Sequence, residues 1–191
     1  CYCPSGKDNT CKKRFGWNLG QLPEGYDHKY IYSHLGYNMK VTEMQAAIGC
    51  EQLNKLERFT EQRRQNWQRL YDGLKPLEDF FILPEPTTHS SPSWFGFILT
   101  LRDSSSLTRQ KVVQHLESQH VQTRMLFGGN YLKQPVFDEY RRSGKGYRVI
   151  GNLPNSNRIM ENCFWVGVYP GMRKAMLDFI VEQIHAVCQN H

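Results

Sequence analysis

Apolar residues recur every three or four positions over residues 41–71, which is the spacing of one face of an α-helix. Thr42 is a suitable N-cap for the first turn, and Gly73 and Pro76 are residues that typically end a helix. A charged run interrupts the pattern midway. The stretch therefore predicts one long helix, or two helices that meet near residue 59, with one apolar face.

Beyond residue 76 the apolar runs become short and alternate with amphipathic stretches. Branched and aromatic residues cluster in four runs that predict strands, at residues 80–83, 93–101, 121–126 and 163–169. Apolar residues at helical spacing predict three helices, at residues 107–119, 156–162 and 172–187. The segment 128–152 has little periodicity and predicts a long loop. Helices that pack on a small sheet give an α/β fold class, with an α+β small domain.

Residues 1–36 show no sustained period and are rich in Gly, Pro, Asn, Asp and Tyr. The tract is too long for an ordinary connection inside a compact domain, which suggests a functional segment. The chain has 191 residues, and 39% of them are hydrophobic, which is enough for a packed core. No apolar run approaches the roughly 20 residues of a membrane span, and no signal peptide pattern is present. We therefore expect a cytoplasmic protein without a membrane partner.

The formal charge of +6 favours a partner or substrate with negative charge. The sequence contains no RNA-binding aromatic signature, no zinc-finger spacing and no leucine heptad. We therefore expect no nucleic-acid partner. Phosphorylated small molecules and a solvated basic surface both remain compatible with the charge.

Three of the six cysteines, Cys1, Cys3 and Cys11, lie close together with the spacing C-x-C-x7-C. Cys1 and Cys3 are too near each other to pair comfortably, and the cysteine pattern fits a reducing compartment better than a set of disulfides. Zinc and an iron–sulfur cluster remain open as interpretations. The other cysteines lie among apolar neighbours and are predicted to be buried packing residues: Cys50, Cys163 and Cys188. Three methionines are predicted to be packing residues as well: Met39, Met44 and Met125.

Several motifs resemble the sugar-nucleotide aminotransferase and dehydratase family. They are YSHLGYN, MQAAIG, SWFGF, TRMLFGGN and LPNSNRIMENCFWVGVYPGM, and together they extend over nearly the whole chain. The resemblance implies the fold of aspartate aminotransferase and a pyridoxal-type cofactor.

Within this family, the C-x-C-x7-C motif, KRFGW and GYDHKYIYSHLGYN are similar to the iron–sulfur 3-dehydratases of the CDP-4-keto-6-deoxyglucose type, the RfbH-like proteins. The resemblance implies removal of a C3 hydroxyl during 3,6-dideoxyhexose and O-antigen lipopolysaccharide synthesis. It implies pyridoxamine or pyridoxal 5′-phosphate and a 2Fe-2S cluster, with Cys1, Cys3 and Cys11 as three ligands and the fourth outside this chain. It also implies a homodimer, a nucleotide-sugar substrate and an NAD(P)H-dependent iron–sulfur flavoprotein reductase.

The family's catalytic base is a histidine that we expect before residue 1, so no catalytic residue is expected in this chain. His28 and His34 lie downstream of the base and are expected to make structural hydrogen bonds. Asn38 and Lys40 match positions near the cofactor phosphate. The positions expected to contact the substrate are Phe95, Arg124, Asn130 and Gln134.

The resemblance also implies three parts: residues 1–40 as the end of a large cofactor domain, 41–76 as a long connecting helix and 77–191 as the small domain. A sugar aminotransferase of the same fold is the first alternative. The second is a non-catalytic zinc-binding or interaction domain, in which the three N-terminal cysteines and a histidine such as His28 bind zinc.

Overall fold

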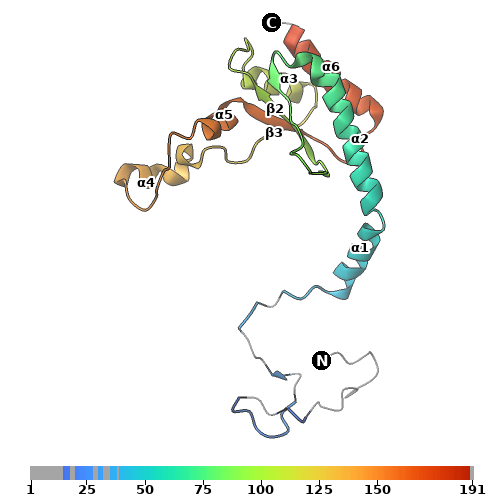
Figure 1. Ribbon diagram of the computed structural model, residues 1–191, viewed down its shortest axis with the longest axis vertical. Helices are drawn as coiled ribbons and strands as arrows, with labels where there is room; N and C mark the ends of the chain where they lie inside the picture. The colour runs from blue at the N-terminus through green and yellow to red at the C-terminus, as the bar shows by residue number, and fades with distance from the viewer. Residues whose placement is uncertain (1–14, 18–19, 28–29, 32–34, 38, 190–191) are drawn as a thin grey trace. The chain divides into compact units, whose positions relative to one another are not determined.

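The structure is a computed structural model (Figure 1). It describes residues 15–17, 20–27, 30–31, 35–37 and 39–189. Several residues of the sequence predictions lie outside these ranges: Cys1, Cys3, Cys11, His28, His34 and Asn38. The chain divides into two compact units, Cys1–Ala47 and Ile48–His191. Within the described residues, none of the helices combines the length and the apolar content needed to cross a lipid bilayer.

The larger unit combines helices with one small sheet, as the sequence predicts. The α-helices of the described chain are α1 (Glu43–Leu53), α2 (Leu56–Leu74), α3 (Arg109–Ser118), α4 (Asp138–Ser143), α5 (Pro154–Asn162) and α6 (Lys174–Gln189). The strands are β1 (Phe81–Ile82), β2 (Gly96–Leu101), β3 (Thr123–Met125) and β4 (Cys163–Gly167). Each strand and helix predicted beyond residue 76 is present with slightly different ends, so the predicted fold class is confirmed.

The four strands form one sheet in the order β1-β2-β4-β3, and every neighbouring pair is antiparallel. Leu99 of β2 faces Phe164 of β4, and both side chains are fully buried. Because side chains alternate along a strand, the next pair, Ile98 and Trp165, lies on the other side of the sheet and is only partly buried. The sheet therefore has one fully buried face and one more exposed face.

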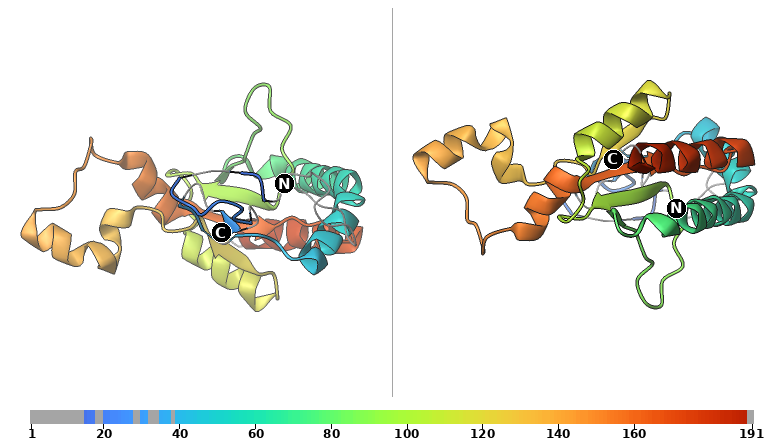
Figure 2. Two further views of the ribbon diagram at one scale, coloured as in Figure 1. Left: turned by 90° about the horizontal axis from the view of Figure 1, so that it is seen from below. Right: turned by 90° about the horizontal axis from the view of Figure 1, so that it is seen from above.

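The buried face packs against α2, α3 and α6 (Figure 2, right). Trp67 of α2 lies at the centre of this contact and is 5% exposed. Its ring stacks on Trp94 at 4.6 Å and lies 5.4 Å from Phe97 of β2. These rings remove a large apolar area from water, which is the main source of stability in such a core.

Gly73, at the predicted end of α2, also allows α2 and α6 to approach closely. A Cβ atom at this position would lie 2.8 Å from Val181 Cγ2 of α6. The carbonyl oxygen of Gly73 also accepts a hydrogen bond of 2.8 Å from His185 Nε2. The helix ends one residue later at Leu74, directly before the turn that contains Pro76.

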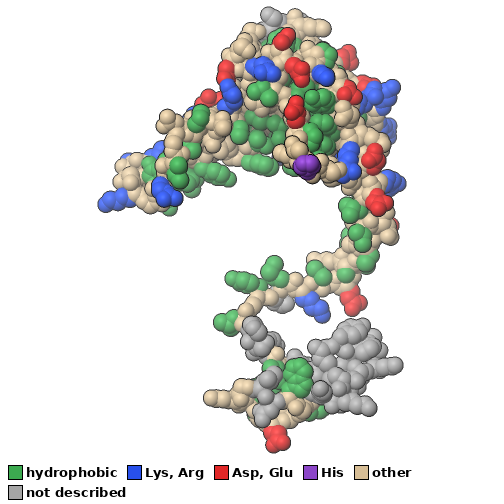
Figure 3. Space-filling view, in the orientation of Figure 1, with side chains coloured by type: hydrophobic (Ala, Val, Ile, Leu, Met, Phe, Trp, Pro, Cys, Tyr) green, Lys and Arg blue, Asp and Glu red, His purple; other side chains and the backbone are tan. Residues whose placement is uncertain are grey.

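The predicted helix over residues 41–71 is present as two helices, which are separated at residues 54–55. The expectation that its first half packs inward is wrong for the described chain, because α1 contains no buried residue. Met44 is 78% exposed, Met39 just before the helix is 83% exposed, and Cys50 is exposed. Figure 3 shows the hydrophobic side chains on the surface of α1. The packing predicted for Met39, Met44 and Cys50 therefore has no partner among the described residues.

The predicted loop of residues 128–152 contains the short helix α4, which the sequence analysis missed. Its sequence, DEYRRS, is almost entirely polar, so it has no apolar period that would reveal it. Three aromatic rings support the turn around it: Phe137 lies 5.6 Å from Tyr140 and 6.5 Å from Tyr147. Gly144 ends the helix in the left-handed conformation, with φ of 65°.

Candidate functional site

The more exposed side of the sheet brings two of the predicted substrate residues together. We call this side the open face and define it by Ile98, Arg124 and Trp165, which lie side by side on β2, β3 and β4. Phe95, which directly precedes β2, contacts this face because its ring centroid is 5.3 Å from that of Trp165. Phe95 and Arg124 are both exposed, so both remain accessible to a ligand.

The orientation of the Trp165 side chain is fixed by its neighbours. Its Nε1 donates a hydrogen bond of 3.1 Å to the carbonyl oxygen of Met125 in β3. Gly96 lies under the indole, where a Cβ atom would be only 2.6 Å from Trp165 Cε3. The ring of Phe95 meets the indole at an angle of 77°. Trp165 and Phe95 therefore form a rigid aromatic corner on the open face.

Arg63 of α2 anchors the backbone beside this corner. Its Nη1 donates two hydrogen bonds of 3.0 Å, one to the carbonyl oxygen of Trp94 and one to that of Val168. The amide of Val168 donates in turn to the carbonyl oxygen of Phe95 at 2.9 Å. A single guanidinium group therefore holds together the start of β2 and the residue that follows β4.

Arg124 is positioned by the anchoring of the residue before it. Glu117 at the end of α3 accepts two hydrogen bonds from Thr123, from the amide at 2.6 Å and from the hydroxyl at 2.7 Å. These bonds hold the pKa of Glu117 below its usual range, and the charge of Arg124 lowers it slightly further. The start of β3 is thus fixed, while the guanidinium of Arg124 remains exposed.

Asn130 and Gln134 hold their own loop together, and neither points its amide at the open face. Asn130 is 6% exposed, donates to Asn157 Oδ1 at 2.8 Å and accepts from the amide of Leu132 at 3.0 Å. Gln134 Nε2 donates to the carbonyl oxygen of Gly128 at 3.0 Å. Both side chains therefore shape the loop that follows Arg124.

The predicted phosphate contact lies at the start of α1. Lys40 is exposed, and it makes no ion pair with any residue that the structure describes. Thr42 and Gln45 form a capping box, in which the amide of Thr42 donates to Gln45 Oε1 at 2.8 Å and that of Gln45 donates to Thr42 Oγ1 at 3.3 Å. These two amides are occupied, and the exposed ammonium group of Lys40 is a further donor close to this helix end.

The cysteines of the larger unit divide into two kinds. Cys163 and Cys188 are buried, which confirms their predicted packing role, and burial raises the pKa of both thiols, that of Cys188 to about 11. Cys50 is exposed instead. Met125, at 40% exposed, is less buried than predicted because it lies in the edge strand β3. Among the described residues, no three His, Cys, Asp or Glu side chains gather into a metal site.

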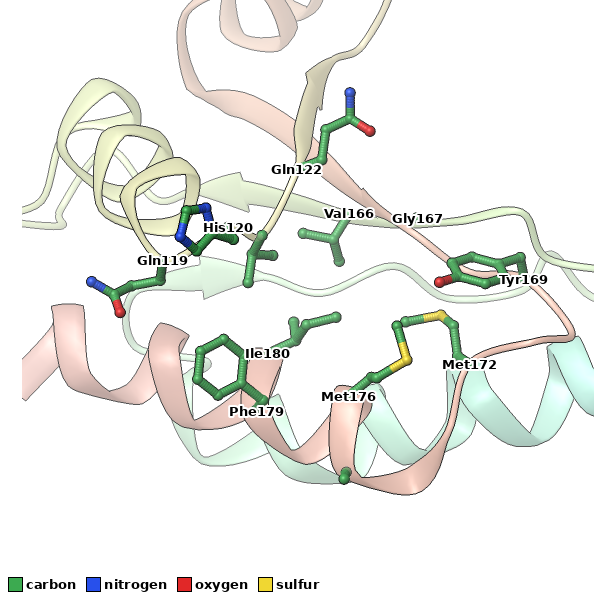
Figure 4. Close-up of a pocket in the computed structure, with 12 residues that line it drawn as sticks. Gln119, His120, Gln122, Val166, Gly167, Tyr169, Met172, Met176, Phe179 and Ile180 are labelled. Atoms are coloured by element: carbon green, nitrogen blue, oxygen red, sulfur yellow. The ribbon is translucent and has the colours of Figure 1, made fainter.

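A cavity of about 710 Å³ is lined by none of these residues. It is a groove between α6 and the segment Gln119–Gln122, and Figure 4 shows Met176, Phe179 and Ile180 on one side with Val166 opposite. No predicted site residue lines it. The groove is mainly apolar, with Gln119, His120 and Gln122 at one side, and no Lys or Arg lines it to pair with a phosphate.

Comparison with known proteins shows the family to which the chain is related. The profile of the DegT/DnrJ/EryC1/StrS aminotransferase family matches residues 14–185. The lipopolysaccharide biosynthesis protein RfbH of Salmonella typhimurium is 50% identical over 183 residues, which cover 96% of this chain and 41% of that protein. The dTDP-4-dehydro-2,6-dideoxy-D-glucose 3-dehydratase of Saccharopolyspora spinosa is 48% identical over 184 residues, covering 96% of this chain and 38% of that enzyme.

A solved structure of similar fold is the E. coli GDP-4-keto-6-deoxy-D-mannose-3-dehydratase with bound hydrated PLP. Its TM-score is 0.69 at 27% sequence identity, and the match covers 92% of this chain and 46% of that chain. The chain spans about two fifths of the length of the curated relatives, 41% and 38%. The fold and the sequence comparisons therefore agree on one family.

Proposed function

Because the chain belongs to the DegT/DnrJ/EryC1/StrS aminotransferase family, we propose that it is part of a nucleotide-sugar 3-dehydratase. The proposed enzyme removes the C3 hydroxyl of CDP-4-keto-6-deoxyglucose in 3,6-dideoxyhexose synthesis for the O antigen, in the cytoplasm. The observation that carries the proposal is the 50% identity to the lipopolysaccharide biosynthesis protein RfbH over 96% of the chain. The second relative, at 48% identity, is itself named a 3-dehydratase.

Lys40 is the described residue that fits the phosphate of a pyridoxamine-type cofactor, together with Asn38 in the proposal. An exposed ammonium group at the start of a helix is a suitable partner for an anion, because the helix end carries partial positive charge. When bound, pyridoxamine phosphate would supply the electron sink that allows the C3 hydroxyl to leave. Lys40 and Asn38 would hold and orient the phosphate and take no part in proton transfer.

The three N-terminal cysteines are the proposed ligands of a 2Fe-2S cluster. Thiolates are the donors that such clusters use, and Cys1, Cys3 and Cys11 provide three of the four required. When assembled, the cluster would supply electrons one at a time from an NAD(P)H-dependent iron–sulfur flavoprotein reductase. The fourth ligand and the catalytic base are proposed to lie outside this chain.

The open face is the proposed substrate side of the chain. Arg124 has an exposed guanidinium, which can donate two hydrogen bonds to a diphosphate. Phe95 would contact the sugar, and Asn130 with Gln134 would hold the adjoining loop in place for the nucleotide. In this proposal residues 1–40 are the end of the large cofactor domain, residues 41–76 are the connecting helical segment, and residues 77–191 form the small domain. The full-length enzyme is proposed to be a homodimer.

Metal analysis of the full-length protein tests the cluster. Anaerobically prepared protein is expected to contain iron and sulfide in equal amounts and to absorb visible light. Cys11→Ser should lose most of the iron, whereas Cys50→Ser should retain it, because Cys50 is an exposed cysteine outside the motif. A colourless protein with one zinc ion and no iron would instead support a structural zinc site.

Turnover of CDP-4-keto-6-deoxyglucose by the full-length protein tests the reaction. Mass spectrometry is expected to show loss of the C3 oxygen when a reductase and NAD(P)H are present. The aminotransferase alternative predicts a different product, a 4-amino sugar formed at the expense of glutamate. If only the amino sugar appears, the dehydratase proposal is wrong.

A further inference from the structure

Trp165 lies at the centre of the open face, although its sequence context gives it no functional role. In the sheet, Trp165 is the cross-strand partner of Ile98 in β2 on one side and of Arg124 in β3 on the other. Phe95 closes the end of the same surface through its ring contact with Trp165. Trp165 therefore joins Phe95 and Arg124 into one continuous surface.

The indole is held in place before any ligand binds. The hydrogen bond from Nε1 to the Met125 carbonyl fixes the rotation of the ring, and the space above Gly96 accepts its flat face. A ligand that stacks on a side chain already fixed in one rotamer costs little additional conformational entropy. Such preorganisation favours a role in recognition.

The chemistry of the surface defines the ligand that fits it. A rigid apolar ring beside an exposed guanidinium is complementary to a molecule with one apolar ring face and an anionic group close to it. A 6-deoxyhexose attached to a diphosphate has both features, since its C–H groups and its methyl group form an apolar face. The groove in Figure 4 fits less well, because no Lys or Arg lies among its lining residues.

We propose that Trp165 binds the deoxyhexose ring of the nucleotide sugar, with Arg124 on the diphosphate. The inference rests on the proposed function and assigns recognition of the sugar, as distinct from the nucleotide, to one residue. Gly96 is a positioning residue in this arrangement, because its missing side chain leaves room for the indole.

The test uses the full-length enzyme with Trp165→Leu and Trp165→Phe. Trp165→Leu is expected to raise the KM for CDP-4-keto-6-deoxyglucose about tenfold, the effect of losing one stacked aromatic contact. The same variant should leave the Kd for CDP within about twofold by calorimetry, because CDP has no hexose. Trp165→Phe keeps a ring and is expected to raise KM only about threefold.

Phe179→Leu is the matched control, since Phe179 is an exposed aromatic residue on α6 outside the open face. Phe179→Leu should change neither the KM for CDP-4-keto-6-deoxyglucose nor the Kd for CDP. An unchanged KM in Trp165→Leu, or equal weakening of CDP and of the sugar nucleotide, overturns the proposal. If Trp165→Leu does not fold, Gly96→Ala replaces it, because the added Cβ displaces the indole and must raise KM as well.

Failure of the proposed function gives a different result. In that case the wild-type protein does not dehydrate the 4-keto sugar nucleotide, and calorimetry with CDP-glucose in place of the substrate still tests Trp165. Weaker binding of CDP-glucose by Trp165→Leu, by about tenfold with CDP unchanged, supports the role of Trp165 in sugar binding. Equal binding of CDP-glucose by the variant and the wild type overturns it.

Discussion

The two faces of the sheet are formed by alternating residues of the same strands, but they differ in burial. On one face Phe97, Leu99 and Phe164 are fully buried under helices. On the open face Ile98 and Trp165 alternate with them in the chain and remain only partly buried. Because strand side chains alternate, one residue belongs to the packed core and the next one to the surface that is proposed to bind the substrate. Substitutions on one face are therefore expected to leave the property of the other face largely intact.

The largest effect is expected from Phe164→Ala on the buried face. Phe164 has 0% exposure and lies 6.5 Å from the ring of Phe81, so truncation leaves a cavity. The free energy of unfolding should fall by about 3–5 kcal/mol, measured by urea denaturation. Trp165→Leu is the matched change on the open face and should cost about 1 kcal/mol. Equal losses in the two variants would contradict the division between the faces.

Arg63→Gln is expected to have an intermediate effect, because Arg63 joins the edges of both faces. The variant leaves the carbonyl oxygens of Trp94 and Val168 without their donor, at a cost of about 1–3 kcal/mol. Hydrogen exchange of the Val168 amide, which bonds to Phe95, should accelerate more than exchange elsewhere in the sheet.

Arg64→Gln is the control for Arg63. Arg64 donates to the carbonyl oxygens of Pro92 and Ser91, in the segment between β1 and β2. Its loss should cost less than about 1 kcal/mol and should leave exchange of the Val168 amide unchanged. If both variants accelerate that exchange equally, Arg63 has no special role at the aromatic corner.

The smallest effect is expected at the edge strand, from Thr123→Val. The pKa of Glu117 is lowered because Thr123 donates to its carboxylate, so this contribution is present above the ordinary pKa of about 4.5 and is lost as the pH falls through the lower folded value. At neutral pH the variant should lose less than about 1 kcal/mol, because the pair is exposed. The difference from the wild type should shrink in acid.

Ser118→Ala is the uncharged control for that pH dependence. Ser118 donates to the carbonyl oxygen of His115 in the same helix turn, and no carboxylate takes part. Its effect on the free energy of unfolding should therefore be the same at neutral and at acid pH. A difference between the wild type and Thr123→Val that stays constant with pH would mean that the hydrogen bond from the Thr123 hydroxyl to Glu117 does not stabilise β3.

The sequence predicted the helices well but did not predict which of them pack. The apolar pattern of residues 41–71 covers both α1 and α2, yet α2 buries Trp67, Leu70 and Leu74 whereas α1 has no buried residue. Periodicity reports that a face is apolar and contains no information on the surface that covers it. This limit explains why Met44 and Cys50 are exposed although they were predicted to pack. Helix α4 was missed for a different reason, because it has no apolar face to detect.

The candidate site was only partly predictable from the family motifs, which contain Trp165 as well as Phe95 and Arg124. Phe95 and Arg124 lie in family motifs, and the structure places both beside the open face. Asn130 and Gln134 lie in or near the same motif, but only the structure shows that their amides make hydrogen bonds within the loop that follows β3. Trp165 was missed because it lies in a continuous apolar run, where either face of a strand is possible.

The contact between Gly96 and Trp165 restricts which amino acids can occur together at these two positions in related proteins. A Cβ at position 96 would lie 2.6 Å from the indole, so a side chain cannot be gained at one position while the other keeps its bulk. A residue larger than Gly at 96 is therefore expected only together with a residue smaller than Trp at 165. This combined replacement at positions 96 and 165 is expected in relatives that bind a different sugar.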